Sequence, residues 1–198
     1  MTTALLLSGG MDSCAIAYWK RPDIAITVDY GQKPAKGEIR AAKAISGVLG
    51  LTHVVVTADI SALGSGDLAG AEALTHAPAS EWWPYRNQYL ITLAAMKCQQ
   101  AGATKLLIGA LATDGFHIDG RPEFIARMND LFALQEGDLV VEAPAHNLTA
   151  AELVLTSYIP REVLAWSHSC HTSEHACGFC RGCRKHFETM DEAFGEAY

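Results

Sequence analysis

The stretch that decides the fold is residues 3–13, which read TALLLSGGMDS. Residues 3–8 form a short apolar run of the kind that makes a buried strand in a parallel sheet. Two glycines follow at once, and the apolar spacing then becomes helical, which predicts a helix over about 12–20. A buried strand that runs through a glycine pair into a helix is typical of an α/β domain with an anion-binding turn.

The remaining sequence repeats this alternation of short apolar runs and helical patterns. It predicts an α/β fold with a doubly wound, parallel, five-stranded sheet and helices on both faces. Such sheets bind ligands at the carboxyl ends of their strands, and we expect the switch point beside the first strand. Further strands are expected over 24–30, 52–57, 104–109 and 138–142, and further helices over 34–49, 85–101, 122–135, 149–156 and 183–194.

Residues 58–84 lose the pattern, because small and polar residues and several glycines replace the apolar runs. A stretch of that length without regular structure is usually functional or mobile. We interpret it as an active-site flap or an interface segment, with a disordered surface loop as the alternative.

Composition excludes several classes of protein. The chain has 198 residues, of which 49% are hydrophobic, so one compact domain can bury a sizeable core. Its net charge of −7 is unfavourable for sequence-independent binding to nucleic acid. No apolar run is long enough to cross a membrane, and the N-terminus lacks the pattern of a secretory signal. We therefore expect a soluble, cytoplasmic protein with no membrane partner and no stable nucleic-acid binding.

The glycine turn carries the groups that hold phosphates. Gly9 and Gly10 allow several amide N–H groups to face one concavity, and the following helix adds its N-terminus. Ser8 and Ser13 add hydroxyl groups, and Asp12 suits a helix cap or a magnesium ligand. The sequence lacks both the Walker A ending and the Gly-x-Gly-x-x-Gly pattern of dinucleotide sites. The alternative is a tight strand-to-helix turn capped by the aspartate.

Four of the six cysteines crowd near the C-terminus, at positions 170, 177, 180 and 183. Cys-x-x-Cys turns supply pairs of thiolates at the spacing that zinc prefers, so we expect structural zinc held by Cys170, Cys177, Cys180 and Cys183. An iron–sulfur cluster is the alternative, although the proline of the ferredoxin pattern is missing here. His168, His171 and His175 are substitute ligands. The isolated Cys14 and Cys98 are expected to be buried small residues.

The segment from Ser8 to Ser13 resembles the pyrophosphate loop of the N-type ATP pyrophosphatases. Together with the cysteine cluster, it makes the chain resemble the 7-cyano-7-deazaguanine synthases, the QueC-like enzymes that make the nitrile precursor of queuosine and archaeosine. The resemblance covers about residues 4–194. The other matching segments are 29–32 with Glu38, Pro84 with Arg86 and Asn87, 119–124 without Gly120, Thr149 with Glu152 and Leu153, 166–170 without His168, and the cysteine end through Lys185.

The resemblance implies a fold like that of the adenine nucleotide alpha hydrolases. An ATP pyrophosphatase-type domain would span 1–165. A four-cysteine zinc segment with the terminal helix would span 166–198 and pack on the same domain. The implied cofactors are ATP, Mg²⁺ and structural Zn²⁺. The implied partners are ATP and a small deazapurine, with a homodimer as the oligomeric state.

The resemblance also implies roles for individual residues. The ATP-binding residues are Leu7, Ser8, Gly9, Gly10, Met11, Asp12 and Ser13. The catalytic residues are Asp12, Lys33, Arg86 and Asp119. The substrate-binding residues are Tyr30, Gln32, Arg86, Asn87, Asp114, Asp119, Arg121 and Glu123. A carboxylate of 7-carboxy-7-deazaguanine would be adenylated and would react with ammonia to give an amide. A second ATP would convert that amide to the nitrile.

The sequence departs from the family in the presumed substrate pocket. Lys33-Pro34 replaces Arg-His, Gly120 replaces a cysteine, Ala150 replaces a lysine, and the loop over 114–119 is one residue short. Three alternatives therefore stay open. The first is a ligase of a bacterial defence system that joins a deazapurine to a protein amine. The others are an ATP-dependent RNA thiolase and a non-catalytic nucleotide-binding module.

Overall fold

The computed structural model describes residues 1–195, and its centre is a five-stranded sheet in the order β3-β2-β1-β4-β5. Every neighbouring pair is parallel, which confirms the predicted α/β sheet. The chain builds β2 and β3 on one side of β1 and then crosses to build β4 and β5 on the other. The order therefore reverses beside β1, as expected. The strands are β1 (Thr2–Leu6), β2 (Ile24–Asp29), β3 (Thr52–Thr57), β4 (Ala103–Leu107) and β5 (Val140–Glu142).

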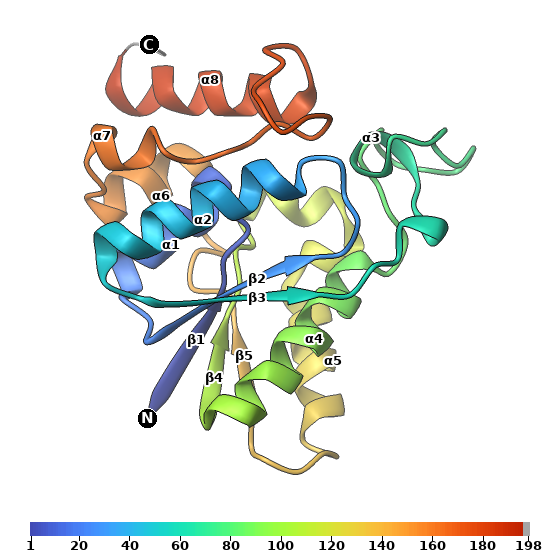
Figure 1. Ribbon diagram of the computed structural model, residues 1–198, viewed down its shortest axis with the longest axis vertical. Coiled ribbons are helices and arrows are strands. Elements are labelled where there is room, and N and C mark those ends of the chain that lie inside the picture. The colour runs from blue at the N-terminus through green and yellow to red at the C-terminus, as the bar shows by residue number, and fades with distance from the viewer. Residues whose placement is uncertain (196–198) are drawn as a thin grey trace.

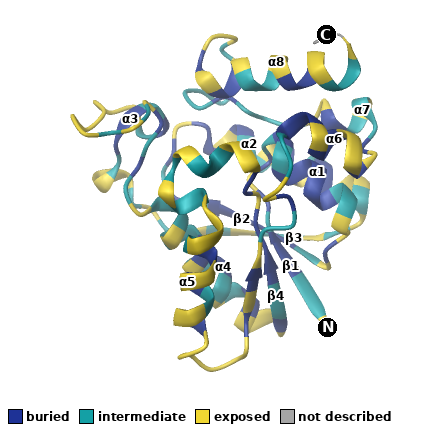
Figure 2. Cartoon of the chain, turned by 180° about the vertical axis from the view of Figure 1, so that it is seen from behind, coloured by how far each residue is buried: buried dark blue, intermediate teal, exposed yellow. Residues whose placement is uncertain are grey.

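Helices cover both faces of this sheet (Figure 1). One face packs against α1 (Met11–Lys20), α2 (Ala35–Leu49) and α6 (Ala150–Ser157), and the other against α4 (Arg86–Ala101) and α5 (Pro122–Phe132). Because side chains alternate along a strand, Leu5 and Leu7 enter the first core cluster while Ala4 enters the second. Figure 2 shows the resulting buried sheet between helices whose outer faces are exposed.

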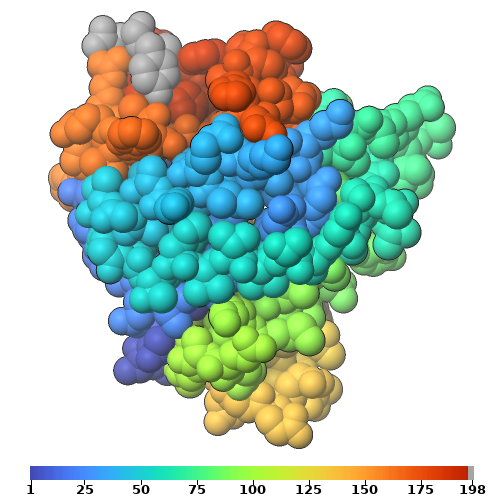
Figure 3. Space-filling model, in the orientation of Figure 1, coloured from blue at the N-terminus to red at the C-terminus, as the bar shows by residue number. Residues whose placement is uncertain are grey.

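The C-terminal segment lies across the first helical layer and covers one end of the molecule (Figure 3). It contains α8 (Arg181–Phe194), and the short α7 (Arg161–Leu164) comes before it. Met190 of α8 is fully buried in the same cluster as residues of α1 and α6. The terminal helix therefore shares its core with the sheet. Residues 196–198 of the expected 166–198 segment lie outside the described residues.

Several boundaries differ from the expected ones. The last helix begins at Arg181 rather than near Cys183, because the Cys180 sulfur accepts a hydrogen bond from the Cys183 amide and caps the helix. The helix expected over 122–135 ends at Phe132, and the sequence pattern does not predict α7. Within residues 1–195, no helix has both the length and the apolar character needed to cross a membrane.

Residues 58–84 form short pieces of structure with buried anchors. They contain a 3₁₀ turn (Ser61–Leu63) and α3 (Gly66–Ala69). Leu68 and Trp83 are buried in the second core cluster, and the Trp83 ring packs edge-on against Tyr30 with 5.2 Å between ring centroids. These anchors favour an ordered flap over the alternative of a disordered surface loop.

Candidate active site and metal centre

A cavity of about 380 Å³ opens at the carboxyl ends of β1, β2 and β4. The flap over 58–84 supplies one wall, the loop after β4 a second, and the C-terminal segment a third. This is the position expected for a ligand of a doubly wound sheet, and the volume suits a small molecule.

The backbone of the glycine turn is fixed by its packing and hydrogen bonds in a shape that can receive an anion. Gly9 has φ of +80°, and a Cβ there would clash with the Glu38 carbonyl oxygen, so only glycine fits. The Ser8 hydroxyl accepts from the Gly10 amide at 3.2 Å, and the Ser13 hydroxyl donates to the Gly10 carbonyl at 2.9 Å. Gly10 is the N-cap of α1 and places no side chain over the helix end. The first-turn amides of α1 are therefore available to phosphate oxygens, and Asp12 does not cap the helix.

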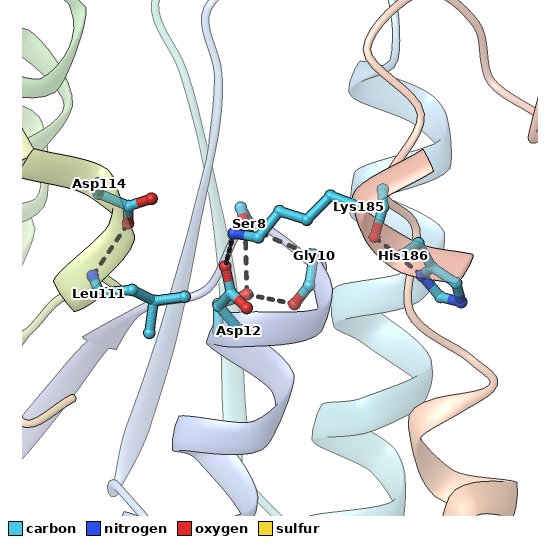
Figure 4. A network of polar contacts seen from close by, with 9 residues as sticks. Ser8, Gly10, Asp12, Leu111, Asp114, Lys185 and His186 are labelled. Atoms are coloured by element: carbon cyan, nitrogen blue, oxygen red, sulfur yellow. Dashed lines mark hydrogen bonds and ion pairs between the residues drawn. The ribbon is translucent and has the colours of Figure 1, made fainter. Parts of the chain in front are cut away.

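An ion pair crosses from this turn to α8 (Figure 4). Lys185 Nζ lies 2.8 Å from Asp12 Oδ2, while Asp12 Oδ1 is buried and has no hydrogen-bond partner among the described residues. Asp114 lies near this pair and accepts a hydrogen bond from the Leu111 amide at 2.9 Å. Burial raises the pKa of Asp114. Burial alone would lower the pKa of Lys185, but the carboxylates of Asp12 and Asp114 outweigh it and raise that pKa. One carboxylate of the turn itself, one carboxylate of the loop after β4 and one lysine of α8 therefore gather beside the turn.

The first turn of α2, which follows β2, places the weakly acidic carboxyl group of Glu38 in the cavity wall. Glu38 Oε2 accepts a hydrogen bond from Gln32 Nε2 at 2.6 Å. Gln32 is itself buried, and its Oε1 accepts from the Tyr30 amide at 2.8 Å. Burial raises the pKa of Glu38 to about 7, although Gln32 and Arg86 both act to lower it. Gln32 therefore does not line the cavity but positions Glu38, which does.

The structure brings most of the expected site residues to the cavity. Arg86 opens α4 and donates to the Asn87 side-chain oxygen at 3.3 Å from both Nε and Nη2. These two residues line the cavity with Tyr30, Asp114 and Asp119, as do the loop residues Leu7, Ser8, Gly10, Met11, Asp12 and Ser13. Gly9 lies beneath the loop, where it is buried against α2.

Besides Gly9 and Gln32, three further expected residues lie outside the cavity lining. The Lys33 stem packs against Gly70, and the Lys33 amide donates to the Leu68 carbonyl. Arg121 Nε donates to the Gly115 carbonyl at 2.8 Å and so pins the loop after β4. Glu123 lies exposed in the first turn of α5. Lys33 and Arg121 are thus held by local contacts, and none of these three side chains lines the cavity.

The cavity residues that sequence reasoning missed include an ion pair between the flap and α8. Glu81 of the flap is only 8% exposed, and its Oε1 lies 2.5 Å from Arg181 Nη1 and 3.5 Å from His117 Nε2. The pair of Glu81 and Arg181 closes the cavity between the flap and α8. Arg181 and Lys185 are four residues apart, so helical spacing places them on one face. That spacing could have identified the wall that α8 forms.

The four clustered cysteines form one compact set of sulfur atoms. Their Sγ atoms all lie within 4.8 Å of one another, and the pairs Cys177–Cys183 and Cys170–Cys180 are both 3.9 Å apart. Backbone amides of Cys180, Cys183 and His171 donate to these sulfurs at 3.3 to 3.4 Å. Such a set could hold a metal ion. Among residues 1–195 the group consists of the four cysteines, and none of the candidate histidines belongs to it.

The four-cysteine cluster adjoins the glycine turn over residues 8–13. The His168 amide donates to the Gly9 carbonyl at 2.8 Å. A Cβ on Gly37 would lie 2.7 Å from both the Glu174 carbonyl oxygen and His168 Nε2, so α2 approaches this segment closely. Gly182 likewise leaves no room for a side chain beside the Ser169 carbonyl. The cysteine segment is therefore fitted directly onto the turn and its neighbouring helix.

Comparison with known proteins gives one consistent family. The family model described as queuosine biosynthesis protein QueC matches residues 2–194. The 7-cyano-7-deazaguanine synthase of Methanococcus maripaludis (strain S2) is 30% identical, over 98% of this chain and 95% of that protein. The synthase of Methanocaldococcus jannaschii is 29% identical, over 93% and 92%.

A solved structure shares the fold. It is described as U34-tRNA thiolase NcsA from Methanococcus maripaludis with its [4Fe-4S] cluster. The match has a TM-score of 0.54 and 18% sequence identity, and it covers 100% of this chain and 67% of that one. At this identity the likeness shows the fold alone.

Proposed function

Because the chain belongs to the QueC family, we propose that it is an ATP-dependent carbon–nitrogen ligase that makes 7-cyano-7-deazaguanine from 7-carboxy-7-deazaguanine and ammonia. One observation carries the proposal. The glycine turn over residues 8–13, called the phosphate turn from here on, opens into a cavity. The other walls of that cavity present Arg86, Asn87 and Asp119 to a small polar ligand. A phosphate site beside a polar pocket is what adenylation of a carboxylate requires.

The chain contributes position and charge to this chemistry rather than a covalent intermediate. The first-turn amides of α1 and the serine hydroxyls would hold the outer phosphates, and the substrate carboxylate would attack the α-phosphate and release pyrophosphate. The acyl-adenylate is a good acyl donor to ammonia, and a second ATP would activate the amide oxygen. Burial raises the pKa of Cys14, and that of Cys98 to about 11, so neither is a ready nucleophile.

Magnesium would neutralise the phosphates, and Asp12 would be its ligand. The carboxylate oxygen of Asp12 that has no hydrogen-bond partner among the described residues can take that role. Its position in the first turn of α1 is beside the amides that would receive phosphate.

We propose that the four cysteines hold structural zinc. A zinc ion bound at about 2.3 Å by four thiolates places the sulfurs roughly 3.8 Å apart. Two pairs of sulfurs are 3.9 Å apart, and all four sulfurs lie within 4.8 Å of one another. A multi-iron cluster places several irons among its thiolates and needs a wider set. Four protein ligands leave no open position, so the ion would organise the segment and would not activate water.

The proposal is tested by incubating the protein with MgATP, 7-carboxy-7-deazaguanine and ammonium. Mass spectrometry should show the amide and then the nitrile, with release of pyrophosphate. Absence of both products would contradict the synthase assignment.

A second candidate is supported by the loop after β4. Phe116 and Ile118 are 56% and 75% exposed beside the cavity, and a Cβ on Gly120 would lie 2.6 Å from the Asp114 carbonyl oxygen, so this loop is folded tightly back. Exposed apolar side chains next to an acyl-adenylate would suit a protein amine as acceptor. Release of pyrophosphate without amide or nitrile in the same assay would favour this ligase.

A further inference from the structure

Lys185 lies at the phosphate turn, whereas Lys33, the lysine expected among the catalytic residues, does not. The Lys185 Nζ lies 2.8 Å from Asp12, whereas the Lys33 stem packs on Gly70 away from the cavity. Position 150 supplies no cation either, since Ala150 is buried in the first core cluster. Among residues 1–195, Lys185 is the one lysine in the cavity lining.

The cavity around the turn carries more negative than positive side chains, so a bound triphosphate would need Lys185 to offset the repulsion. Within the described part of the chain, the cavity is lined by five carboxylates and three Lys or Arg side chains. Arg181 is paired with Glu81 at the flap. Arg86 lies near Glu38 and Tyr30 at the end of β2. Of these three cations, Lys185 is the one that faces the phosphate turn, where the Asp12 carboxylate would otherwise repel a triphosphate.

The pairing of Lys185 with Asp12 is exchangeable. The Lys185 side chain is 43% exposed, and Asp12 is the one hydrogen-bond partner of its Nζ among residues 1–195. A lysine ammonium on a flexible stem can change partners over a few ångströms, and phosphate oxygens are strong acceptors for it. The other carboxylate oxygen of Asp12 has no partner in the same part of the chain.

From this geometry we infer that Lys185 is a nucleotide-binding residue whose ammonium leaves Asp12 to contact the phosphates when ATP fills the turn. The exchange releases the Asp12 carboxylate for the magnesium ion that accompanies ATP. The ammonium then faces the oxygens on which negative charge grows as pyrophosphate departs. This inference rests on the proposed ATP-dependent function and adds a residue to it.

The position of Lys185 ties nucleotide binding to the metal centre. Cys180 caps α8 and Cys183 lies in its first turn, so the four-cysteine site fixes the start of the helix that carries the lysine. A chain emptied of metal should therefore bind MgATP as weakly as a Lys185 variant does.

The test measures equilibrium binding of MgATP, without any carboxylate substrate, to the full chain. Lys185→Gln should weaken binding about 10- to 100-fold, the range expected for one charge-assisted hydrogen bond. Arg184→Gln removes the same charge from the next residue, which is exposed and does not line the cavity, and should leave binding unchanged. Lys185→Arg keeps a cation and should recover at least part of the lost affinity. Equal binding by wild type and Lys185→Gln would overturn the inference.

A second comparison separates phosphate contact from an effect through Asp12. If the lysine only neutralises that carboxylate, Lys185→Gln should have no effect in the Asp12→Asn background, where the carboxylate is already gone. If the lysine contacts phosphate, the weakening of ATP binding should persist in that background. Loss of the effect would reduce Lys185 to a structural partner and overturn the inference.

The failure of this inference can be told from failure of the proposed function. Weaker MgATP binding by Lys185→Gln in a protein that forms no nitrile would support the lysine and contradict the synthase. Nitrile formation with unchanged ATP binding by the variant would do the reverse. A wild-type chain that binds no MgATP would overturn both.

Discussion

The phosphate turn and the cysteine segment lie side by side, yet they are stabilised in different ways. The turn is fixed by the chain itself, through Gly9 beneath α2 and the hydrogen bonds of Ser8 and Ser13. In the cysteine segment, the core cluster consists of the cysteines themselves, so little apolar packing orders it. The first region is held by its own contacts, whereas the second would be completed by the metal that we propose for it.

Removing the metal should give the largest effect, because it affects the region without its own core. We expect Cys180→Ala to lose one equivalent of bound zinc and to destabilise the protein by about 4 kcal/mol or more. Metal analysis and limited proteolysis over 166–195 are the measurements. A purified protein with absorption near about 400 nm would instead indicate iron–sulfur ligation and would contradict the zinc proposal.

Breaking the preformed region requires a change in its backbone. Gly9→Ala places a side chain at a positive φ and against the Glu38 carbonyl, so it should cost about 2–4 kcal/mol and abolish pyrophosphate release. Urea denaturation measures the loss. Gly10→Ala is the matched control for stability, because Gly10 has φ of −71° and a Cβ there meets its nearest neighbour, Ser8 Oγ, at 3.3 Å. Equal destabilisation by both changes would contradict the packing argument.

Asp12→Ala should separate chemistry from stability within the same turn. The side chain is not a helix cap, so the far-ultraviolet spectrum should stay native. Pyrophosphate release should fall by about 100-fold or more, because a magnesium ligand beside the phosphates is lost. Wild-type turnover in this variant would remove the catalytic assignment of the loop.

The smallest expected effect is a pH-dependent difference in stability between wild type and Glu38→Gln. The folded-state pKa of about 7 lies above the ordinary glutamate value of 4.5, so the charged form is disfavoured by folding. The resulting penalty is absent below pH 4.5, grows as pH rises toward 7, and is fully present above it. Glu38→Gln should therefore be more stable than wild type by on the order of 2 kcal/mol at about pH 8 and equal to it at about pH 4.5. Denaturation curves at the two pH values test this, and a difference independent of pH would count against it.

The sheet and the two sites were predictable because their patterns are local. A strand followed by Gly9 and Gly10 specifies its own turn, and the cysteine spacing brings its own sulfurs together. The side chains that surround a ligand are set by tertiary packing instead. Lys33 follows β2 closely but turns to the flap, whereas Lys185 reaches the turn from 173 residues further along the chain than Asp12. The position of Glu81 in the cavity could not be predicted for the same reason, since the flap that carries it has no regular sequence pattern.

The hydrogen bond from the His168 amide to the Gly9 carbonyl also sets an order of maturation. A newly made chain can form the sheet and its glycine turn from their own contacts. The backbone that contacts the Gly9 carbonyl belongs to the cysteine segment, which the proposed zinc would order. Nucleotide binding would then be the last property to develop. Amide hydrogen exchange should record this sequence, with protection over 166–171 arising only after zinc is added to metal-free protein and protection of the strands already present before it.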